Sequence, residues 1–465
     1  MSDKQYHIAT YGCQMNVADS QRLGSALEQR GYRWTDDEAD ADILVVNTCV
    51  VRQQAEEKGI GRIGSFRRHK LNGRQPIVGL MGCMVGVRSP APLREQFPWV
   101  DVFLPPSEPG PLLALLDGDE WDSEAYFQEV KARRMLNTLI DEQTTSEVIL
   151  PAHERQALIS AHVPIVYGCS HMCTFCIIPY RRGVERSRHV GDVVGEVRSL
   201  VAQGVKEVTL LGQIVDRYGY DIADGPRLQD LLYQLHEVEG LQRIRFLTSH
   251  PNYMTDEILE AVAALPKVME QFELPVQAGN NELLRRMRRD YTVEEYRELI
   301  QRVRARIPHA AIHGDIIVGF PGESEAQFMD TYNLIAELRP DKQHLAKFSP
   351  RPHTPAARMA DDVSPEEKSR RLQMLNVLME EISTEINSRY LDTVQEVLVE
   401  DQHKGKWRGR TRTNKLVFFE DERNRKGELV DVQITYTAAW SMQGVPTDLP
   451  VHDPNAGLEL LPMVG

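Results

Sequence analysis

The feature that most constrains this chain is a regular alternation of strand and helix patterns that begins at Ala161. Short apolar runs recur at residues 162–167, 207–211, 243–247, 271–276, 312–318 and 344–348. Amphipathic segments separate them, and the clearest has Val193 and Val197 on one face and ends at Gly204. Strands that alternate with helices form parallel sheets, because each connection must cross over the sheet. We therefore expect an α/β fold with an open (β/α)6 barrel over residues 156–385.

The first third of the chain predicts a second α/β domain, with its own parallel sheet. Three apolar runs, at residues 7–11, 43–46 and 77–81, each lead within three residues to a cysteine. The segments between them have helical spacing, which indicates βαβ units. We expect this domain to span residues 1–118 and to be followed by a polar, acidic linker over residues 119–155.

The last part of the chain predicts a small β-barrel. A long helical pattern that includes Leu375 and Ile382 gives way near Tyr390 to the short alternating runs VQEVLV, KLVFF and LVDVQITY. We place this barrel at residues 386–455, with a tail at 456–465. Three domains agree with a length of 465 residues, which exceeds what one hydrophobic core usually supports.

Composition narrows the class of protein. Hydrophobic residues make up 42% of the chain and charged residues 26%, which is ordinary for a globular protein. No apolar run approaches a membrane span, and the opening MSDKQYHIATYGC lacks the features of a secretory signal. We therefore expect a cytoplasmic protein that binds no membrane. The net charge of -14 weighs against a strongly basic nucleic-acid binder, although it averages over local patches.

Three of the six cysteines, Cys169, Cys173 and Cys176, stand in one loop after the first strand of the expected barrel. So few cysteines in a long cytoplasmic chain favour metal binding over disulfides. Three thiolates on one loop can hold three irons of a 4Fe-4S cluster and leave the fourth iron open to a small ligand. The alternative is a zinc site with His171 as a further ligand, but zinc usually prefers paired C-x-x-C spacing.

The other three cysteines, Cys13, Cys49 and Cys83, follow three different strands of the first domain. Parallel strands end at the same edge of a sheet, which is where open α/β folds bind ligands. We therefore expect the three thiols to meet at that edge and to hold a second three-cysteine 4Fe-4S cluster. The alternative is that they are ordinary buried cysteines.

Longer motifs carry a family resemblance. YGCQMN, NTCVVR, YGCSHMCTFCIIPYRRG, VTLLGQ, ELPVQAGN, DIIVGFPGE and FSPRPHTPAA occur in this order over almost the whole chain. Together they resemble the methylthiotransferase family of radical S-adenosylmethionine enzymes, and most closely its tRNA-modifying members. The resemblance implies that residues 1–118 form a methylthiotransferase domain, residues 156–385 the radical S-adenosylmethionine domain, and residues 386–455 an RNA-binding TRAM domain.

The resemblance also implies a reaction, its cofactors and its partners. One S-adenosylmethionine would methylate a sulfur held at the Cys13, Cys49 and Cys83 cluster, and a second would yield a 5′-deoxyadenosyl radical at the other cluster. The product would be 2-methylthio-isopentenyladenosine next to the anticodon. The expected partners are the anticodon stem-loop of tRNA and a low-potential electron donor such as flavodoxin or ferredoxin, and the enzyme would be a monomer.

Gln213, Gln277 and Asp315 are the candidate cofactor-binding side chains. They stand at or near expected strand ends around the mouth of the barrel, where such side chains belong, but they could equally be ordinary strand-end polar residues. The family pattern is broken beside two of them. Where such proteins typically read Q-N-V-N-S-Y-G, residues 213–219 read QIVDRYG, and the usual Q-S-G-S reads QAGN at 277–280.

Basic residues cluster in three places. They are Arg181, Arg182, Arg186 and Arg188; Arg285, Arg286, Arg288 and Arg289; and the basic strip of Lys404, Lys406, Arg408, Arg410, Arg412 and Lys415. The basic strip contains no acidic residue and includes Trp407, which could stack on a base. We expect RNA contact there, whereas a solvated charged face is the alternative for all three clusters.

Other functions remain compatible with the sequence. One is methylthiolation of a ribosomal-protein aspartate, and another is methylthiolation of a differently modified tRNA adenosine. A non-catalytic alternative is an iron–sulfur electron carrier, or an RNA-binding protein with structural metal. The basic segment GRTRTNKLVFF favours RNA as the partner, and an electron carrier generally saturates its irons with cysteine.

Overall fold

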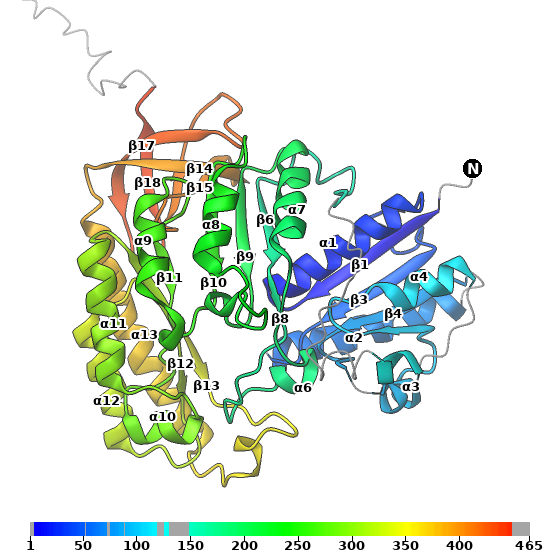
Figure 1. Cartoon of the computed structure of the whole chain (residues 1–465), viewed down its shortest axis with the longest axis horizontal. Coiled ribbons are helices and arrows are strands. Elements are labelled where there is room, and N and C mark those ends of the chain that lie inside the picture. The colour runs from blue at the N-terminus through cyan, green and yellow to red at the C-terminus, as the bar shows by residue number, and fades with distance from the viewer. Residues whose placement is uncertain are drawn as a thin grey trace, which may run out of the picture. The chain divides into compact units, whose positions relative to one another are not determined.

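A computed structural model describes residues 4–51, 53–71, 75–87, 89–118, 125–129 and 148–448 (Figure 1). The chain divides into two compact units, residues 1–376 and 377–465. Much of the expected linker, residues 119–124 and 130–147, and the expected tail lie outside the described residues. Within the described part of the chain, no helix has the length and apolar character that a membrane crossing requires.

The first unit begins with a five-stranded parallel sheet in the order β2-β1-β3-β4-β5. Its strands are β1 (Gln5–Tyr11), β2 (Arg33–Trp34), β3 (Ile43–Thr48), β4 (Ile77–Gly82) and β5 (Val102–Leu104). The central strand β3 is buried along its whole length, as its continuous apolar run ILVV indicates for a strand covered on both faces. The predicted N-terminal parallel sheet is therefore confirmed.

Helices cover both faces of this sheet. On one face, Leu23 and Leu27 of α1 (Gln14–Gln29) and Leu112 of α4 (Gly110–Asp117) pack into one core. On the other face, Ile63 and Phe66 of α2 (Gln53–Leu71) form a second core, against which α3 (Ala91–Gln96) packs. The carboxyl edge between the two layers stays available for a site.

Six parallel strands form the open barrel of the same unit. They are β6 (Ser160–Pro164), β9 (Glu207–Leu211), β10 (Arg243–Leu247), β11 (Gln271–Glu273), β12 (Ala311–Val318) and β13 (Lys342–Lys347). They pair as β10-β9-β6 and β11-β12-β13, and a parallel bridge between Ile244 and Val268 joins the two sets. The strands follow the predicted runs closely, so the (β/α)6 prediction is confirmed.

The helices of the barrel pack along the outside of its strands (Figure 1). They include α7 (Val190–Ala202), α8 (Leu228–His236), α9 (Asp256–Ala264), α10 (Asn281–Met287), α11 (Val293–Arg306) and α12 (Glu325–Leu338). A small antiparallel pair, β7 (Val166–Tyr167) and β8 (Arg186–Ser187), brackets the cysteine loop and the short helix α6 (Ile178–Arg182). Helix α13 (Pro365–Ser388) runs from the first unit into the second.

The second unit contains a closed barrel in the order β14-β15-β16-β18-β17. Its strands are β14 (Val394–His403), β15 (Lys406–Arg410), β16 (Leu416–Phe419), β17 (Leu429–Thr437) and β18 (Met442–Pro446). The predicted small β-barrel is confirmed. The expectation that Trp407 stacks on a base is wrong, because its ring is 6% exposed within the barrel core and its Nε1 donates to the Asp421 carbonyl at 3.1 Å.

Candidate active site

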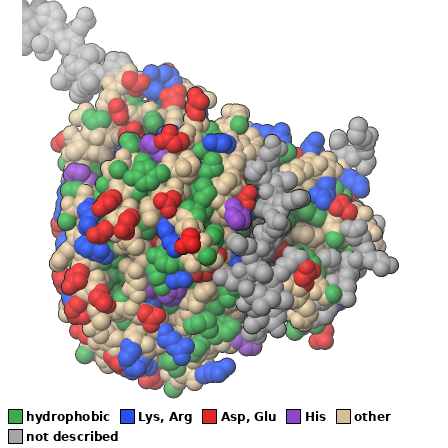
Figure 2. All heavy atoms as spheres, viewed as in Figure 1, with side chains coloured by type: hydrophobic (Ala, Val, Ile, Leu, Met, Phe, Trp, Pro, Cys, Tyr) green, Lys and Arg blue, Asp and Glu red, His purple; other side chains and the backbone are tan. Residues whose placement is uncertain are grey.

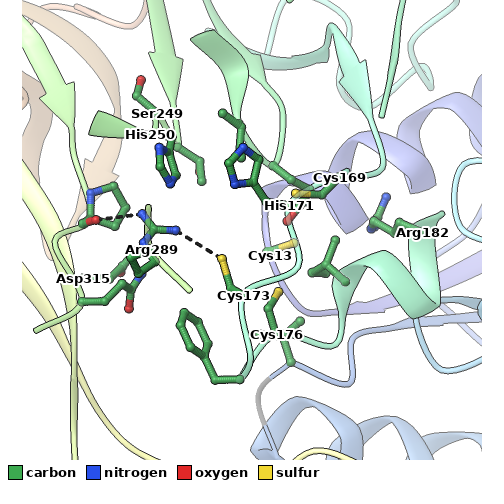
Figure 3. A pocket seen from close by; sticks show the side chains of 18 of the residues that line it. Cys13, Cys169, His171, Cys173, Cys176, Arg182, Ser249, His250, Arg289 and Asp315 are labelled. Carbon is green, nitrogen blue, oxygen red and sulfur yellow. Dashed lines mark hydrogen bonds between the residues drawn. The ribbon is translucent and has the colours of Figure 1, made fainter. Parts of the chain in front are cut away.

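All six cysteines of the chain line one cavity of about 260 Å³ in the first unit. Figure 3 labels Cys13, Cys169, Cys173 and Cys176. Three come from the carboxyl edge of the five-stranded sheet, and three come from the loop between β7 and α6. Two triplets that the sequence places far apart therefore face a shared space. We call Cys13, Cys49 and Cys83 the sheet triplet, and Cys169, Cys173 and Cys176 the loop triplet.

The sheet triplet is built by three strand ends. Cys13 follows β1 and is the N-cap residue of α1, while Cys49 and Cys83 come directly after β3 and β4. Cys49 interacts with the thiols of both Cys13 and Cys83. The expected meeting of the three thiols at one sheet edge is what the structure displays.

Two buried asparagines, which sequence reasoning missed, hold this edge together. Asn16 Nδ2 donates to Asn47 Oδ1, and Asn47 Nδ2 donates to the Asn16 carbonyl, both at 2.9 Å. Gly82 has φ +99°, and a Cβ there would lie 2.4 Å from Asn47 Oδ1, so the approach to Cys83 requires glycine. The signal was present in the motifs YGCQMN and NTC, which place an asparagine close to each of two cysteines.

Arg182 brings a positive charge from α6 to the sheet triplet. Its Nε donates to Cys83 Sγ at 3.2 Å, and its Nη2 donates to Asp19 Oδ2 at 3.1 Å. Arg182 is 2% exposed and Asp19 is 1% exposed, so this ion pair is fully buried. The neighbouring Arg181 donates to the Met84 carbonyl at 3.3 Å.

The electrostatics of the sheet triplet favour thiolates at two of its positions. The hydrogen bond with Cys49 and the Arg182 charge lower the pKa of Cys13 to about 6 and that of Cys83 to about 7. Cys49 lies between them, and its interactions with both thiols raise its pKa. Deprotonated sulfur is the form that binds metal.

The loop triplet is held by backbone contacts around its loop. The Cys169 amide donates to the Gly183 carbonyl at 3.0 Å, and the Thr174 amide donates to the Met287 carbonyl at 3.0 Å. Gly168 has φ +69°, and a Cβ there would lie 2.0 Å from the Val184 carbonyl oxygen. Only glycine fits this turn without displacing the backbone beside it.

In the loop triplet, burial disfavours the thiolate at two positions. Burial raises the pKa of Cys169 and of Cys176 to about 12. The nearest buried cation is Arg289, whose Nη1 donates to Cys173 Sγ at 3.5 Å and whose Nη2 donates to the Pro275 carbonyl at 3.1 Å (Figure 3). These thiols therefore need a strong Lewis acid, such as iron, to lose their protons.

The chemistry of the donors fits two iron–sulfur clusters better than single ions. Among the described residues, no three His, Cys, Asp or Glu side chains converge on one ion position. A cubane cluster does not need such convergence, because each cysteine binds a different iron. Three thiols per site, in a cavity that other ligands can enter, match a cluster with one open iron.

Buried polar atoms without partners indicate that a polar ligand binds in the cavity. Ser249 Oγ, His250 Nε2 and Gln277 Oε1 have no hydrogen-bond partner within the described chain, although all three side chains are at least nine-tenths buried and line the cavity. Buried polar groups normally find partners, so a ligand with its own donors and acceptors would complete them. The amino, carboxylate and ribose groups of S-adenosylmethionine have that character.

The three predicted cofactor-binding residues, Gln213, Gln277 and Asp315, all line the cavity. Sequence reasoning missed Ser249 and His250, although both lie within three residues of the end of the strand β10, as ligand-binding residues of such barrels do.

The departures from the family pattern lie beside the cavity. Ile214 lines it, and the Asp216 carboxyl accepts from the His250 amide at 3.0 and 3.1 Å. Burial raises the pKa of Asp216 to about 8. Arg217 pairs with Glu185, with Nε–Oε2 at 2.8 Å, and its guanidinium lies 4.6 Å from the centre of the Tyr253 ring.

Of the eight arginines in the first two basic clusters, three are buried, three are half-buried and two are exposed. Arg182, Arg188 and Arg289 are buried, and Arg188 pairs with Glu196 at 2.7 Å. The exposed Arg285 pairs with Glu282 at 2.6 Å. These arginines organise the protein rather than forming a continuous cationic surface. Figure 2 shows acidic and basic side chains interspersed over the face that it displays.

The basic strip in the second unit is also accompanied by carboxylates. Lys406 pairs with Glu420 at 3.1 Å, Arg408 with Asp401 at 2.5 Å and Arg410 with Glu400 at 3.3 Å. Lys404 is exposed, Arg412 is half-buried and Lys415 is buried. The strip lacks acidic residues in sequence, but neighbouring strands supply them across the sheet.

Three protein families match successive parts of the chain. Residues 5–105 match the uncharacterized protein family UPF0004, residues 163–335 match the radical SAM superfamily, and residues 388–446 match the TRAM domain. Radical SAM enzymes use a 4Fe-4S cluster and S-adenosylmethionine, in agreement with the chemistry of the loop triplet.

Relatives match almost the whole chain. A tRNA-2-methylthio-N(6)-dimethylallyladenosine synthase of Chloroflexus aurantiacus is 44% identical over 449 residues, which cover 96% of this chain and 92% of the relative. A synthase of the same name from Roseiflexus sp. is 45% identical over 448 residues, or 95% of this chain and 90% of the relative. Among solved structures, the radical S-adenosylmethionine methyltransferase TsrM from Kitasatospora setae has a similar fold. It is 15% identical with a TM-score of 0.55, over 76% of this chain and 75% of that chain.

Proposed function

Since the chain belongs to the MiaB-type family of radical SAM tRNA methylthiotransferases, we propose that it converts isopentenyladenosine next to the anticodon into its 2-methylthio derivative with two 4Fe-4S clusters. The observation that carries this proposal is the pair of cysteine triplets that face one cavity. One triplet would generate the radical and the other would hold the sulfur that is transferred.

S-adenosylmethionine supplies a methyl group and, after one-electron cleavage beside a cluster, a 5′-deoxyadenosyl radical. In our proposal Cys169, Cys173 and Cys176 hold that cluster, and Gln213, Gln277 and Asp315 line the place where the cofactor lies. Ser249 and His250 would give the cofactor two further polar contacts. Ser249, His250 and Arg289 are buried around this place, which excludes water from a radical that would otherwise be quenched.

Cys13, Cys49 and Cys83 would hold the second cluster, to which the sulfur is attached before it is methylated. The lowered pKa of Cys13 and of Cys83 supports this assignment, because thiolates are the ligands that iron needs. A shared cavity lets the activated substrate carbon reach that sulfur without leaving the dry space.

The TRAM domain and the names of the relatives indicate tRNA binding. We assign RNA binding to the basic strip. Lys406, Arg408 and Arg410 alternate with buried positions along β15 and so project from one face of the strand. Lys404, Arg412 and Lys415 complete the strip. Ion pairs with three carboxylates reduce its net charge, so we expect the strip to orient the anticodon stem rather than to supply most of the affinity.

Replacing Arg408, Arg410 and Arg412 with glutamate should weaken tRNA binding and flatten its salt dependence, because fewer counterions are released from the RNA. Filter binding at several salt concentrations measures both. A matched control, Arg389→Glu, changes an exposed arginine directly after α13 that pairs with Glu385. Unchanged affinity in the triple variant would remove this surface from the proposal.

The proposal also includes the electron donor, the oligomeric state, the cellular compartment and the domain boundaries. An electron donor of low potential, such as flavodoxin or ferredoxin, would reduce the radical cluster of a monomeric enzyme in the cytoplasm. We place the domain boundaries near residues 118, 155 and 385, so that each of the three family matches falls within one domain.

Nucleoside mass spectrometry of tRNA tests the function directly. Cells without this protein should accumulate isopentenyladenosine, and the wild-type gene should restore the 2-methylthio derivative. A gene with Cys169, Cys173 and Cys176 changed to alanine should not restore it. Normal tRNA in the deletion strain, with a methylthio group missing from a ribosomal-protein aspartate instead, would move the enzyme to the alternative substrate.

A further inference from the structure

We infer that Arg182 is a positioning residue for the cluster of the sheet triplet, and that its hydrogen bond to Cys83 raises the reduction potential of that cluster. The inference rests on the proposed function, because it assumes that Cys13, Cys49 and Cys83 hold a cluster. Arg182 belongs to α6, the helix that follows the loop triplet. The segment that carries the loop triplet therefore also supplies a cation to the cluster of the sheet triplet.

The contacts of Arg182 fix its guanidinium in place. Nε points to Cys83 Sγ at 3.2 Å, while Nη2 and Nη1 donate to Asp19 Oδ2 at 3.1 Å and to Ser107 Oγ at 3.3 Å. Ser107 Oγ in turn donates to Asp19 Oδ1 at 2.6 Å. A planar guanidinium can meet three acceptors at once, which a lysine ammonium on a flexible stem does less precisely.

The electrostatic consequence follows from burial. Reduction adds a negative charge to a cluster, and a buried cation beside a ligand sulfur stabilises that charge strongly because little water screens it. Hydrogen bonds to the sulfurs and local net charge are known determinants of cluster potentials. Asp19 opposes the effect of Arg182, since its carboxylate lies beside the same guanidinium.

A purely structural role is the competing explanation, because buried ion pairs also join domains. The two explanations differ in sign. If Arg182 and Asp19 only hold domains together, removing either charge should disturb folding without an ordered change in potential. If they tune the cluster, removing the Asp19 charge must raise the reduction potential of the cluster. Removing the Arg182 charge as well must lower that potential again.

The experiment uses the full-length chain with Cys169, Cys173 and Cys176 changed to alanine, so that only the cluster of the sheet triplet gives a signal. A redox titration followed by electron paramagnetic resonance measures the ratio of reduced to oxidised cluster. In this background, Asp19→Asn should raise that ratio about tenfold at fixed potential, which is about 59 mV for a one-electron couple. Asp19→Asn with Arg182→Gln should reverse the increase.

Arg181→Gln is the matched control, because Arg181 lies on the same helix but donates to the Met84 carbonyl rather than to sulfur. It should leave the potential unchanged. Should the double variant hold no iron, Arg182→Lys decides the question, since it keeps the charge and gives up the donor to Cys83. That variant should have a lower potential than the background.

The outcomes distinguish a failure of the proposed function from a failure of the role of Arg182. No cluster in the triple-alanine background would refute the proposed division into two cluster sites, and the inference with it. A cluster that is present, with a potential that none of these variants changes, would overturn the role of Arg182 alone.

Discussion

The sheet triplet and the loop triplet each present three thiols to one cavity, but they are built in opposite ways. Cys13, Cys49 and Cys83 come from three strand ends and lie beside a buried ion pair. The loop triplet comes from one short segment, and burial raises the pKa of both Cys169 and Cys176. Each triplet has a buried arginine beside one thiol, Arg182 at Cys83 and Arg289 at Cys173, and Arg182 also pairs with the buried Asp19.

Two further titratable groups near the loop triplet are neutral, whereas two near the sheet triplet form an ion pair. On the side of the loop triplet, burial raises the pKa of Asp216 to about 8 and lowers the pKa of His250 to about 2, so both are uncharged near neutral pH. On the side of the sheet triplet, Arg182 and Asp19 are paired although both are buried. Neutral side chains at positions 216 and 250 suit a carbon-centred radical, and the buried ion pair suits anionic sulfur.

The largest effect should come from removing the loop triplet. Changing Cys169, Cys173 and Cys176 to alanine should abolish both 5′-deoxyadenosine formation and methylthiolation, because both depend on the radical. The purified protein should retain about half of its iron, on the stoichiometry of two four-iron clusters. Iron analysis and chromatography of the products measure these quantities. Complete loss of iron from a folded variant would show that the two sites are not independent.

Removing the sheet triplet should have a narrower effect. With Cys13, Cys49 and Cys83 changed to alanine, methylthiolation should disappear while 5′-deoxyadenosine remains detectable, since the loop triplet, to which we assign the radical cluster, is unchanged. Product analysis with and without tRNA makes the comparison. Equal loss of both activities would argue that the triplets share one task.

A backbone change should damage the loop triplet alone. Gly168→Ala places a Cβ 2.0 Å from the Val184 carbonyl oxygen, so the loop must shift and about half of the iron should be lost. Gly31→Ala is the control, because Gly31 has φ +86° but no atom within 4 Å of the added Cβ. It should cost about 1–2 kcal/mol and keep both clusters. Thermal unfolding and iron analysis compare the two, and equal behaviour would contradict a steric requirement at Gly168.

The smallest effect concerns the pH dependence of stability. Asp216 titrates near pH 8 in the folded protein but near about 4 when unfolded. Its raised pKa contributes stability that is present at low pH and is lost, by about 1 kcal/mol per pH unit, as pH rises from about 4 to about 8. Asp216→Asn should lack this contribution, so its stability should fall less with rising pH than that of the wild type.

Denaturant unfolding of the apo-protein between pH 5 and pH 9 measures the slope. Asp224→Asn is the control, since Asp224 is exposed in the same connection between β9 and α8. If Asp216→Asn had the same slope as the wild type, Asp216 would not have a raised pKa in the folded protein.

Much of this arrangement could be predicted from the sequence, because it follows from local patterns. Apolar runs located the strands, and parallel strands that each lead into a cysteine were sufficient to bring Cys13, Cys49 and Cys83 to one edge. The loop triplet needed only its spacing. The polar strand ends Gln213, Gln277 and Asp315 were located by the same reasoning.

The features that were missed depend on contacts between distant segments. Arg182 stands in an arginine-rich run that resembles a charged surface, and only the fold shows that it is buried beside Cys83. Trp407 occupies an inward position of β15, which became clear once the register of the barrel was known. The carboxylates that pair with the basic strip lie on adjacent strands, so the strip alone could not reveal them.

The buried contact between Arg182 and Cys83 also sets an order of events during synthesis, because the two residues are 99 positions apart in the chain. A ribosome adds about 5–20 residues per second, so the arginine emerges roughly 5–20 s after the cysteine. The three cysteines of the sheet are thus exposed to the cell before their counter-charge exists. Iron that binds in that interval would enter a site without Arg182. Iron that binds after the barrel has folded would enter a site in which Arg182 is already beside Cys83.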